Sequence, residues 1–92
     1  MNCKKISFSG HVIIQMFKRN ITEEEVSEAI KIGKIIKEYP EDRPFPSYLI
    51  LASVNNKFLH IVAAKENCDV CIVITAYEPD KAIWNNDFST KK

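Results

Sequence analysis

The chain has 92 residues, of which 46% are hydrophobic and 27% charged, and its formal net charge is +1. This composition indicates one globular domain over residues 1–92, and no apolar stretch approaches the roughly 18 residues that a transmembrane helix needs. The near-neutral charge argues against a large basic surface that binds nucleic acid. The lysines and arginines of the first half could form a local basic patch, and the alternative is that they lie on a solvated helix face.

Two helices are predicted near the N-terminus, after a short β-prone segment from Lys4 to Ser9. In the first helix, from His11 to Arg19, apolar residues recur at helical spacing, and Asn20 ends the run. The apolar residues of this helix are Ile13, Ile14, Met16 and Phe17.

The second helix carries the clearest local signals in the sequence. Thr22 is a favourable N-cap, and Glu25 completes a capping box in which each side chain bonds a free backbone N–H of the first turn. Ile21 before the cap and Val26 inside the helix suit a hydrophobic staple. Gly33 is expected to end this helix in a left-handed conformation.

After the second helix the pattern becomes extended, and strands are predicted at residues 35–39, 47–54, 57–65 and 70–77. Three prolines from Pro40 to Pro46 make the first connection a stiff surface loop, because proline removes backbone donors. Trp84 and Phe88 are expected to dock back on the body. The sequence therefore predicts an α+β domain, with two N-terminal helices packed on one face of a four-stranded antiparallel sheet.

The turns decide which strand residues share a face, because side chains alternate along a strand. A type I′ turn at residues 55–56 places Leu51 opposite His60, and a turn at residues 67–68 places His60 opposite Thr75. The helix-facing side then holds Ile50, Ala52, Val54, Leu59, Ile61, Ala63, Val70, Ile72, Ile74 and Ala76. The opposite side holds Leu49, Leu51, Ser53, Phe58, His60, Val62, Cys71, Val73, Thr75 and Tyr77. His60, Thr75 and Tyr77 are therefore expected to cluster away from the helices.

His60 is the first candidate for chemistry, because an imidazole gives or takes a proton near neutral pH. The alternative is a half-buried histidine that only satisfies its neighbours. His11, Arg19 and Arg43 form a second candidate set around a phosphate, since guanidinium groups bind phosphate oxygens bidentately. The alternatives are a surface histidine and an arginine that caps a neighbouring carbonyl.

Three cysteines are present, and Cys68 and Cys71 have the spacing of half a zinc site. A closed site needs four ligands, and only Cys3 and two histidines remain, so we expect ordinary cysteines and neither a metal nor a cofactor. No N-terminal stretch has the features of a secretory signal. We therefore expect a cytoplasmic protein with reduced thiols and no membrane contact.

Four motifs, taken together, resemble a bacterial family named domain of unknown function 4258 (DUF4258), over roughly residues 8 to 88. They are a helix from His11 to Arg19 followed by Ile21-Thr22-Glu23-Glu24-Glu25-Val26, then Tyr39-Pro40-Glu41-Asp42-Arg43-Pro44-Phe45-Pro46-Ser47, Leu59-His60-Ile61-Val62, and Ile74-Thr75-Ala76-Tyr77-Glu78-Pro79-Asp80 with Trp84. Gln15 stands where the family often has another arginine, which counts against a role that needs two helical cations.

The resemblance implies a fold similar to RelE-like toxins, which are small metal-independent ribonucleases of bacterial toxin–antitoxin pairs. It also implies an antitoxin partner, in many cases one with a zinc-binding domain. The leading hypothesis is a ribonuclease that acts on RNA, free or on the ribosome, by attack of a ribose 2′-hydroxyl on the adjacent phosphate.

In this hypothesis His60 is general acid or base, with His11 as a second, and Arg19 and Arg43 hold the phosphate. Thr75 and Tyr77 orient groups by hydrogen bonds. The competing hypothesis is a non-enzymatic module that binds a partner protein or the ribosome through the same face. A third is a catalytically inactive relative that keeps only the antitoxin contact.

Overall fold

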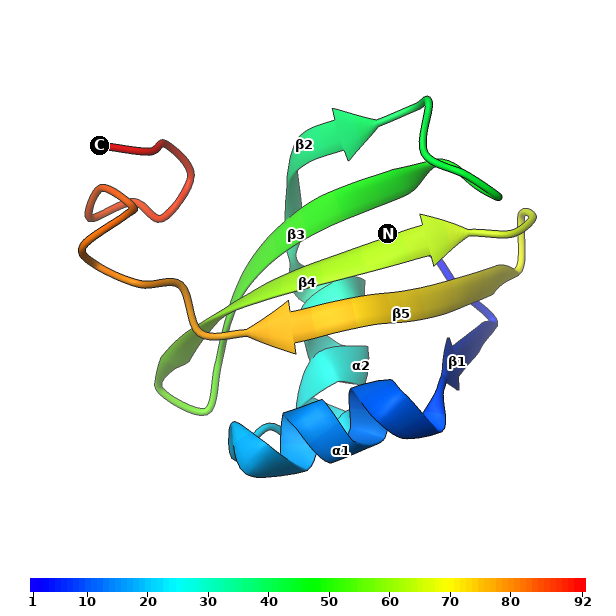
Figure 1. The fold of residues 1–92 in the computed structure, drawn as a ribbon, viewed down its shortest axis with the longest axis horizontal. Coiled ribbons are helices and arrows are strands. Elements are labelled where there is room, and N and C mark those ends of the chain that lie inside the picture. The colour runs from blue at the N-terminus through cyan, green and yellow to red at the C-terminus, as the bar shows by residue number, and fades with distance from the viewer.

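The computed structural model describes all of residues 1–92 and shows an α+β domain built on a single sheet (Figure 1). Its elements are β1 (Lys5–Phe8), α1 (Gly10–Lys18), α2 (Glu23–Ile32), β2 (Lys34–Tyr39), β3 (Ser47–Val54), β4 (Lys57–Lys65) and β5 (Val70–Tyr77). The strand order is β1-β5-β4-β3-β2. Two helices pack on the sheet, as predicted. Neither helix has the length and apolar character needed to span a bilayer.

The predicted four-stranded antiparallel sheet is wrong by one strand, because the β-prone segment at the N-terminus joins the sheet. Strand β1 pairs in parallel with the first half of β5, so the sheet has five strands and is mixed. The backbone N–H groups of Lys4 and Lys5 both donate to the carbonyl of Asp69, at 2.8 and 3.0 Å. A strand of four residues that pairs with a segment so distant in the chain leaves little trace in local sequence.

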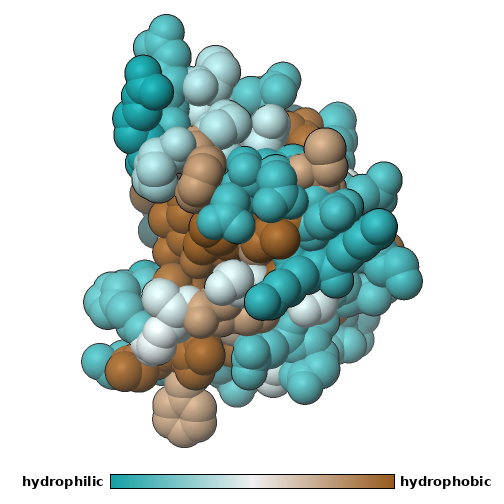
Figure 2. Space-filling view, turned by 90° about the vertical axis from the view of Figure 1, so that its right-hand side faces the viewer, coloured by the Kyte–Doolittle hydropathy of each residue, from teal (hydrophilic) through white to brown (hydrophobic).

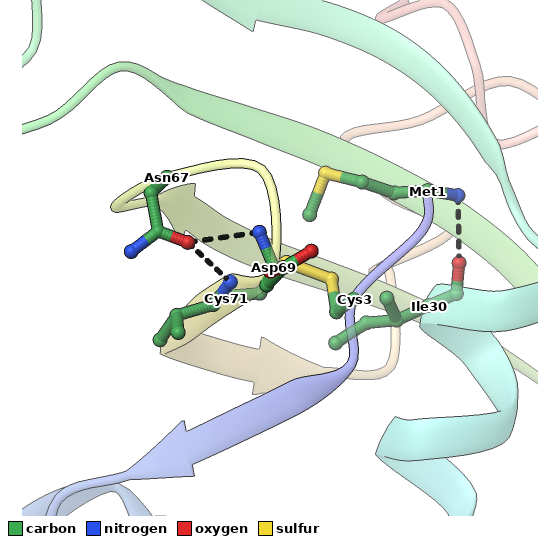
Figure 3. The surroundings of a disulfide bond; sticks show 7 residues. Met1, Cys3, Ile30, Asn67, Asp69 and Cys71 are labelled. Carbon is green, nitrogen blue, oxygen red and sulfur yellow. Dashed lines mark hydrogen bonds between the residues drawn. A yellow bond between two sulfur atoms is a disulfide. The ribbon is translucent and has the colours of Figure 1, made fainter.

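A disulfide between Cys3 and Cys71 ties this N-terminal segment to β5 (Figure 3). The N-terminal ammonium of Met1 also donates to the carbonyl of Ile30 at 2.9 Å, so the segment contacts both β5 and α2. Cys68 is free and exposed. The expectation that all three thiols are reduced is therefore wrong for two of them, because the parallel pairing of β1 with β5 brings Cys3 beside Cys71.

Both helices begin at side-chain caps. The hydroxyl of Ser9 accepts from the N–H of Val12 at 3.2 Å at the start of α1. The predicted capping box of α2 is confirmed: Thr22 Oγ1 accepts from the Glu25 N–H at 3.0 Å, and Glu25 Oε1 accepts from the Thr22 N–H at 2.9 Å. Two orphan donors of the first turn are thereby satisfied, which explains why α2 begins where the sequence indicates.

Gly33 ends α2, but not in the predicted left-handed conformation, because its φ is −73°. It is needed for another reason. A Cβ at this position would lie under 3.0 Å from the carbonyl oxygens of Ala29 and Leu51 and from the side chain of Ile50. The absence of a side chain therefore lets the end of α2 press against β3. The left-handed residue at a helix end is instead Asn20, with φ of 59° after α1.

The core lies between the helices and one face of the sheet. Its fourteen buried residues come from both helices, the connection between them, and β3, β4 and β5. They are Val12, Met16, Ile21, Val26, Ala29, Ile30, Ile50, Ala52, Val54, Leu59, Ile61, Ala63, Val73 and Ala76. Of the four apolar residues that predicted α1, only Met16 is buried, while Phe17 is 86% exposed. Helix α1 therefore presents apolar side chains to solvent. Figure 2 shows that the side of the molecule it draws also carries hydrophobic surface.

The hairpin between β3 and β4 matches its prediction. Leu51 lies opposite His60, and Val54 lies opposite Lys57. Asn55 and Asn56 have φ of 52° and 64°, the two left-handed residues that a type I′ turn requires.

The hairpin between β4 and β5 differs from its prediction in two places. Asn67 accepts from the N–H groups of Asp69 and Val70 at 2.8 and 3.0 Å, which widens the turn, and Lys65 lies opposite Cys71. The pairing then shifts again between Val62 and Ala63, so His60 lies opposite Tyr77 and not Thr75.

The one-residue shift at the turn changes which side chains of β5 enter the core, up to the β-bulge that leaves Ile74 as the extra residue of this strand. Cys71 and Val73 are buried, whereas Ile74 is 45% exposed, so the predicted core positions Val70, Ile72 and Ile74 are wrong. Beyond the bulge the alternation returns to the predicted phase. Thr75 and Tyr77 therefore share a face with Val62 and His60, as expected.

Candidate active site

The sheet face away from the helices is covered at one end by the C-terminal segment 78–92. Trp84 and Phe88 pack on Leu49 there, together with the partly buried Ile36, Tyr39, Leu51 and Val62. The prediction that both aromatic residues dock on the body is confirmed. Figure 1 shows this segment leaving the end of β5 without regular secondary structure.

His60 lies under this segment and has no exposed surface. Its Nε2 is 2.8 Å from the carbonyl oxygen of Phe88, and its ring meets Trp84 edge-on with centroids 4.5 Å apart. A carbonyl oxygen only accepts hydrogen bonds, so Nε2 carries the proton of the neutral ring and Nδ1 is left as an acceptor. Burial lowers the pKa of His60, and the Phe88 carbonyl only partly opposes this, so the ring is neutral at physiological pH.

Tyr77 is the partner of the remaining ring nitrogen. Its hydroxyl lies 3.3 Å from Nδ1 of His60, and with the tautomer derived above the phenol is the donor. The two rings also meet edge-on, with centroids 5.3 Å apart. Tyr77 is half-buried, so the pair has one member inside the protein and one at its surface.

The pKa of Tyr77 is raised by burial and by the neighbouring phenol of Tyr39, whereas the guanidinium of Arg19 lowers it. The hydroxyl therefore keeps its proton at neutral pH. It acts as a base only if the proton passes at the same time to Nδ1 of His60.

Arg19, at the C-terminal end of α1, contacts the edge of β5 beside Tyr77. Its Nη1 donates to Thr75 Oγ1 at 3.2 Å and to the carbonyl of Ala76 at 2.9 Å. No carboxylate pairs with it, because the only ion pairs of the protein are Lys4–Asp69 and Lys57–Glu25. The guanidinium is exposed and positioned, and has donors left for an anion.

The structure thus brings together four of the six candidate residues, which we call the Tyr77 cluster: Arg19, His60, Thr75 and Tyr77. His11 is exposed on the first turn of α1 and hydrogen-bonds only Gln15, at 3.1 Å. Arg19 lies eight positions after His11, roughly 12 Å along the helix axis. Arg43 is exposed in the loop between β2 and β3, at the end of the sheet away from Arg19 (Figure 1). Neither joins the cluster.

Two parts of this site escaped sequence reasoning. Tyr39, on β2, raises the pKa of Tyr77 and lines the same cavity, although two strands lie between β2 and β5 in chain order, and its sequence pattern predicts only a strand residue. The carbonyl of Phe88 sets the tautomer of His60, and a backbone group leaves no signal in sequence. Trp84 was noted as a residue that docks, but its contact with His60 follows only from the fold.

Sequence comparison identifies one relationship. The model of a family described as "Domain of unknown function (DUF4258)" matches residues 8–78, which include all of the Tyr77 cluster. No curated protein matches the chain. No solved structure matches it either.

Proposed function

Since this chain belongs to the DUF4258 family, whose description assigns no activity, we propose from the Tyr77 cluster that it is a toxin-like, metal-independent ribonuclease. The observation that carries the proposal is the hydrogen bond between the surface phenol of Tyr77 and the buried, neutral imidazole of His60, at 3.3 Å. This hydrogen bond provides a path for a proton from the Tyr77 hydroxyl at the surface to Nδ1 of the buried His60. The exposed Arg19 beside it supplies an anion-binding donor.

In the proposed reaction the 2′-hydroxyl of RNA attacks the adjacent phosphorus. Tyr77 takes the hydroxyl proton while its own proton passes to Nδ1 of His60. The 2′-oxygen bonds to phosphorus as the bond to the 5′-oxygen breaks. The 5′-oxygen takes a proton from water, and the hydroxide that remains takes back the proton of His60 through Tyr77, which restores the neutral ring and the phenol. Arg19 and Thr75 contact the phosphate and stabilise the charge that develops on it. His11 and Arg43 have no step in this scheme.

His60 has a different role here from the one that the sequence suggested. A ring with no exposed surface does not touch RNA while the C-terminal segment is in place, so His60 acts through Tyr77. His60→Ala is consequently a poor test, because it removes a buried ring as well as a proton acceptor. Tyr77→Phe removes only the hydroxyl.

The test is cleavage of RNA by the purified protein in the presence of a chelator. The proposal expects 2′,3′-cyclic phosphate and 5′-hydroxyl ends, and Tyr77→Phe should lower the rate by roughly 10²–10⁴-fold. Tyr48→Phe on β3 is the matched control, because Tyr48 pairs with the core residue Ala63 and so lies on the helix-facing side. Wild-type cleavage by a folded Tyr77→Phe protein, or no cleavage by the wild type, would contradict the proposal.

The proposal includes the wider relationship that the sequence motifs suggest: a RelE-like toxin that acts in the cytoplasm, on free or ribosome-bound RNA, and is neutralised by a cognate antitoxin, in many such pairs one with a zinc-binding domain. Growth arrest on induction of the chain alone, relieved by co-expression of the neighbouring gene, would support this. Absence of arrest by a chain that cleaves RNA in vitro would contradict the toxin role alone.

A non-enzymatic binding module is the second candidate, and a specific observation favours it. Helix α1 exposes three large apolar side chains, of which Ile13 and Ile14 are adjacent and Phe17 follows about one turn later: they are 41%, 56% and 86% exposed, respectively. Such exposure is typical of a surface that binds another protein. If the protein is a binding module, the wild type should bind the cognate antitoxin without cleaving RNA. Phe17→Ser should abolish that binding.

A further inference from the structure

A cavity of about 300 Å³ lies beside Tyr77, between β2 and the C-terminal segment. Two aliphatic side chains form part of its wall. The others are polar or aromatic, and they are Lys37, Tyr39, Tyr77, Trp84, Ser89 and Lys91. The cavity therefore includes the proposed catalytic phenol in its wall, and its other lining residues have no step in the scheme above.

The charge of this cavity is positive. Lys37 and Lys91 are its only charged lining residues, and neither forms an ion pair. Each ammonium instead lies over an aromatic ring, Lys37 at 5.3 Å from the centroid of Tyr39 and Lys91 at 5.6 Å from that of Trp84. Two lysines without an acidic partner, held by aromatic walls, suit a ligand that carries a negative charge.

Aromatic walls and cations together are the combination that binds single-stranded nucleic acid, in which bases stack on aromatic rings and cations contact phosphates. The position of the cavity supports a ligand with more than one phosphate. In the strand order, β5 and β2 are three spacings apart, roughly 14 Å. Arg19 lies at the β5 edge, and Lys37 lies on β2, so their cations flank Tyr77.

We propose that this cavity binds a nucleotide of single-stranded RNA next to the phosphate held by Arg19. On binding, Lys37 and Lys91 turn from the rings of Tyr39 and Trp84 to the phosphate of the nucleotide, and its base takes their place beside the rings. The inference rests on the proposed ribonuclease function and adds the site that holds the substrate strand. It also accounts for RNA binding by a chain of near-neutral charge, because the positive charge is local.

Trp84 is the only tryptophan of the protein, so its fluorescence reports on the cavity directly. The probe is a short 2′-O-methyl oligonucleotide, which has no 2′-hydroxyl nucleophile and is not cleaved. Binding should change the emission of Trp84. Lys37→Ala and Lys91→Ala should each weaken binding and reduce the slope of log affinity against log salt concentration by about 0.7, the value for one phosphate contact of a single strand.

Lys31→Ala is the matched control, because Lys31 is an exposed lysine on α2 that lines a different cavity. It should leave both affinity and salt slope unchanged. Inorganic phosphate serves as a competitor. If phosphate alone reproduces the fluorescence change at the same affinity as the oligonucleotide, the cavity is a simple anion site and the nucleotide proposal is wrong.

The outcomes separate this inference from the function on which it rests. Oligonucleotide binding that depends on both lysines, in a protein that does not cleave RNA, would uphold the nucleotide site and refute the ribonuclease. If Lys37→Ala and Lys91→Ala still cleave RNA and still bind the oligonucleotide with wild-type affinity, the ribonuclease is upheld and the nucleotide site is refuted. A melting temperature equal to that of the wild type shows, for each variant, that misfolding is not the cause of a loss of binding.

Discussion

The buried carboxylate of Glu25 makes a sharp prediction about stability and pH. Burial raises its pKa, but the N–H of Thr22 and the side chains of Asn55 and Lys57 outweigh burial and lower the pKa from 4.5 to about 2. Asn55 donates to Oε2 at 3.0 Å, and the ammonium of Lys57 lies 3.1 Å from Oε1. Glu25 thus joins the start of α2 to the β3–β4 turn.

The size of the effect follows from this shift. A folded-state pKa of about 2 against an unfolded value of 4.5 corresponds to about 3 kcal/mol of folding free energy. Because the folded-state pKa is the lower one, this stabilisation is fully present above pH 4.5 and is lost as the pH falls towards 2. Glu25→Gln, which keeps the capping geometry but not the charge, should cost about 3 kcal/mol at neutral pH.

The assay is urea denaturation followed by circular dichroism over a series of pH values. The wild type should exceed Glu25→Gln in stability at neutral pH, and the difference should close as the pH falls from 4.5 towards 2. Glu24→Gln, at an exposed position of the same helical turn, is the control and should change stability by about 0.5 kcal/mol. A constant difference between wild type and Glu25→Gln at all pH values would refute the reasoning.

Three further perturbations test the fold around the site. Reducing the Cys3–Cys71 disulfide, whose residues are 68 apart in sequence, should lower the free energy of unfolding by up to about 4 kcal/mol in urea titrations. Equal stability of the oxidised and reduced protein would contradict a stabilising disulfide between these residues. Gly33→Ala should cost about 2 kcal/mol, because the added Cβ meets backbone carbonyls; an unchanged melting temperature would show that α2 is not pressed against β3. His60→Ala should cost about 3 kcal/mol and shift the emission of Trp84 to longer wavelength, and an unshifted spectrum would mean that the C-terminal segment does not cover this ring.

Local sequence was sufficient wherever a few neighbouring residues determine the outcome. The capping box of Thr22 and Glu25 fixed the start of α2, and the Asn55-Asn56 turn fixed the register of β3 on β4. The candidate site was partly predictable for the same reason. Alternation along β5 beyond the bulge placed Thr75 and Tyr77 on the face of His60.

The register of β5 on β4 was not predictable, because residues 70–74 are all apolar. Such a run satisfies either phase, and no polar residue shows which side chain is the extra one. The wide turn slides the pairing by one residue, and the bulge restores the phase. Thr75 and Tyr77 therefore reach their expected face by a pairing different from the predicted one.

What the sequence determined by itself is thus the helices, the four longer strands and the face that carries the polar residues, since these depend on periodicity and on caps a few residues apart. Only the tertiary structure decided that β1 pairs with β5, that Cys3 meets Cys71, and that the C-terminal segment buries His60. These contacts join segments distant in the chain, and their partners are chosen by the packing of the whole domain. The accessible group of the site is for that reason Tyr77 and not the histidine.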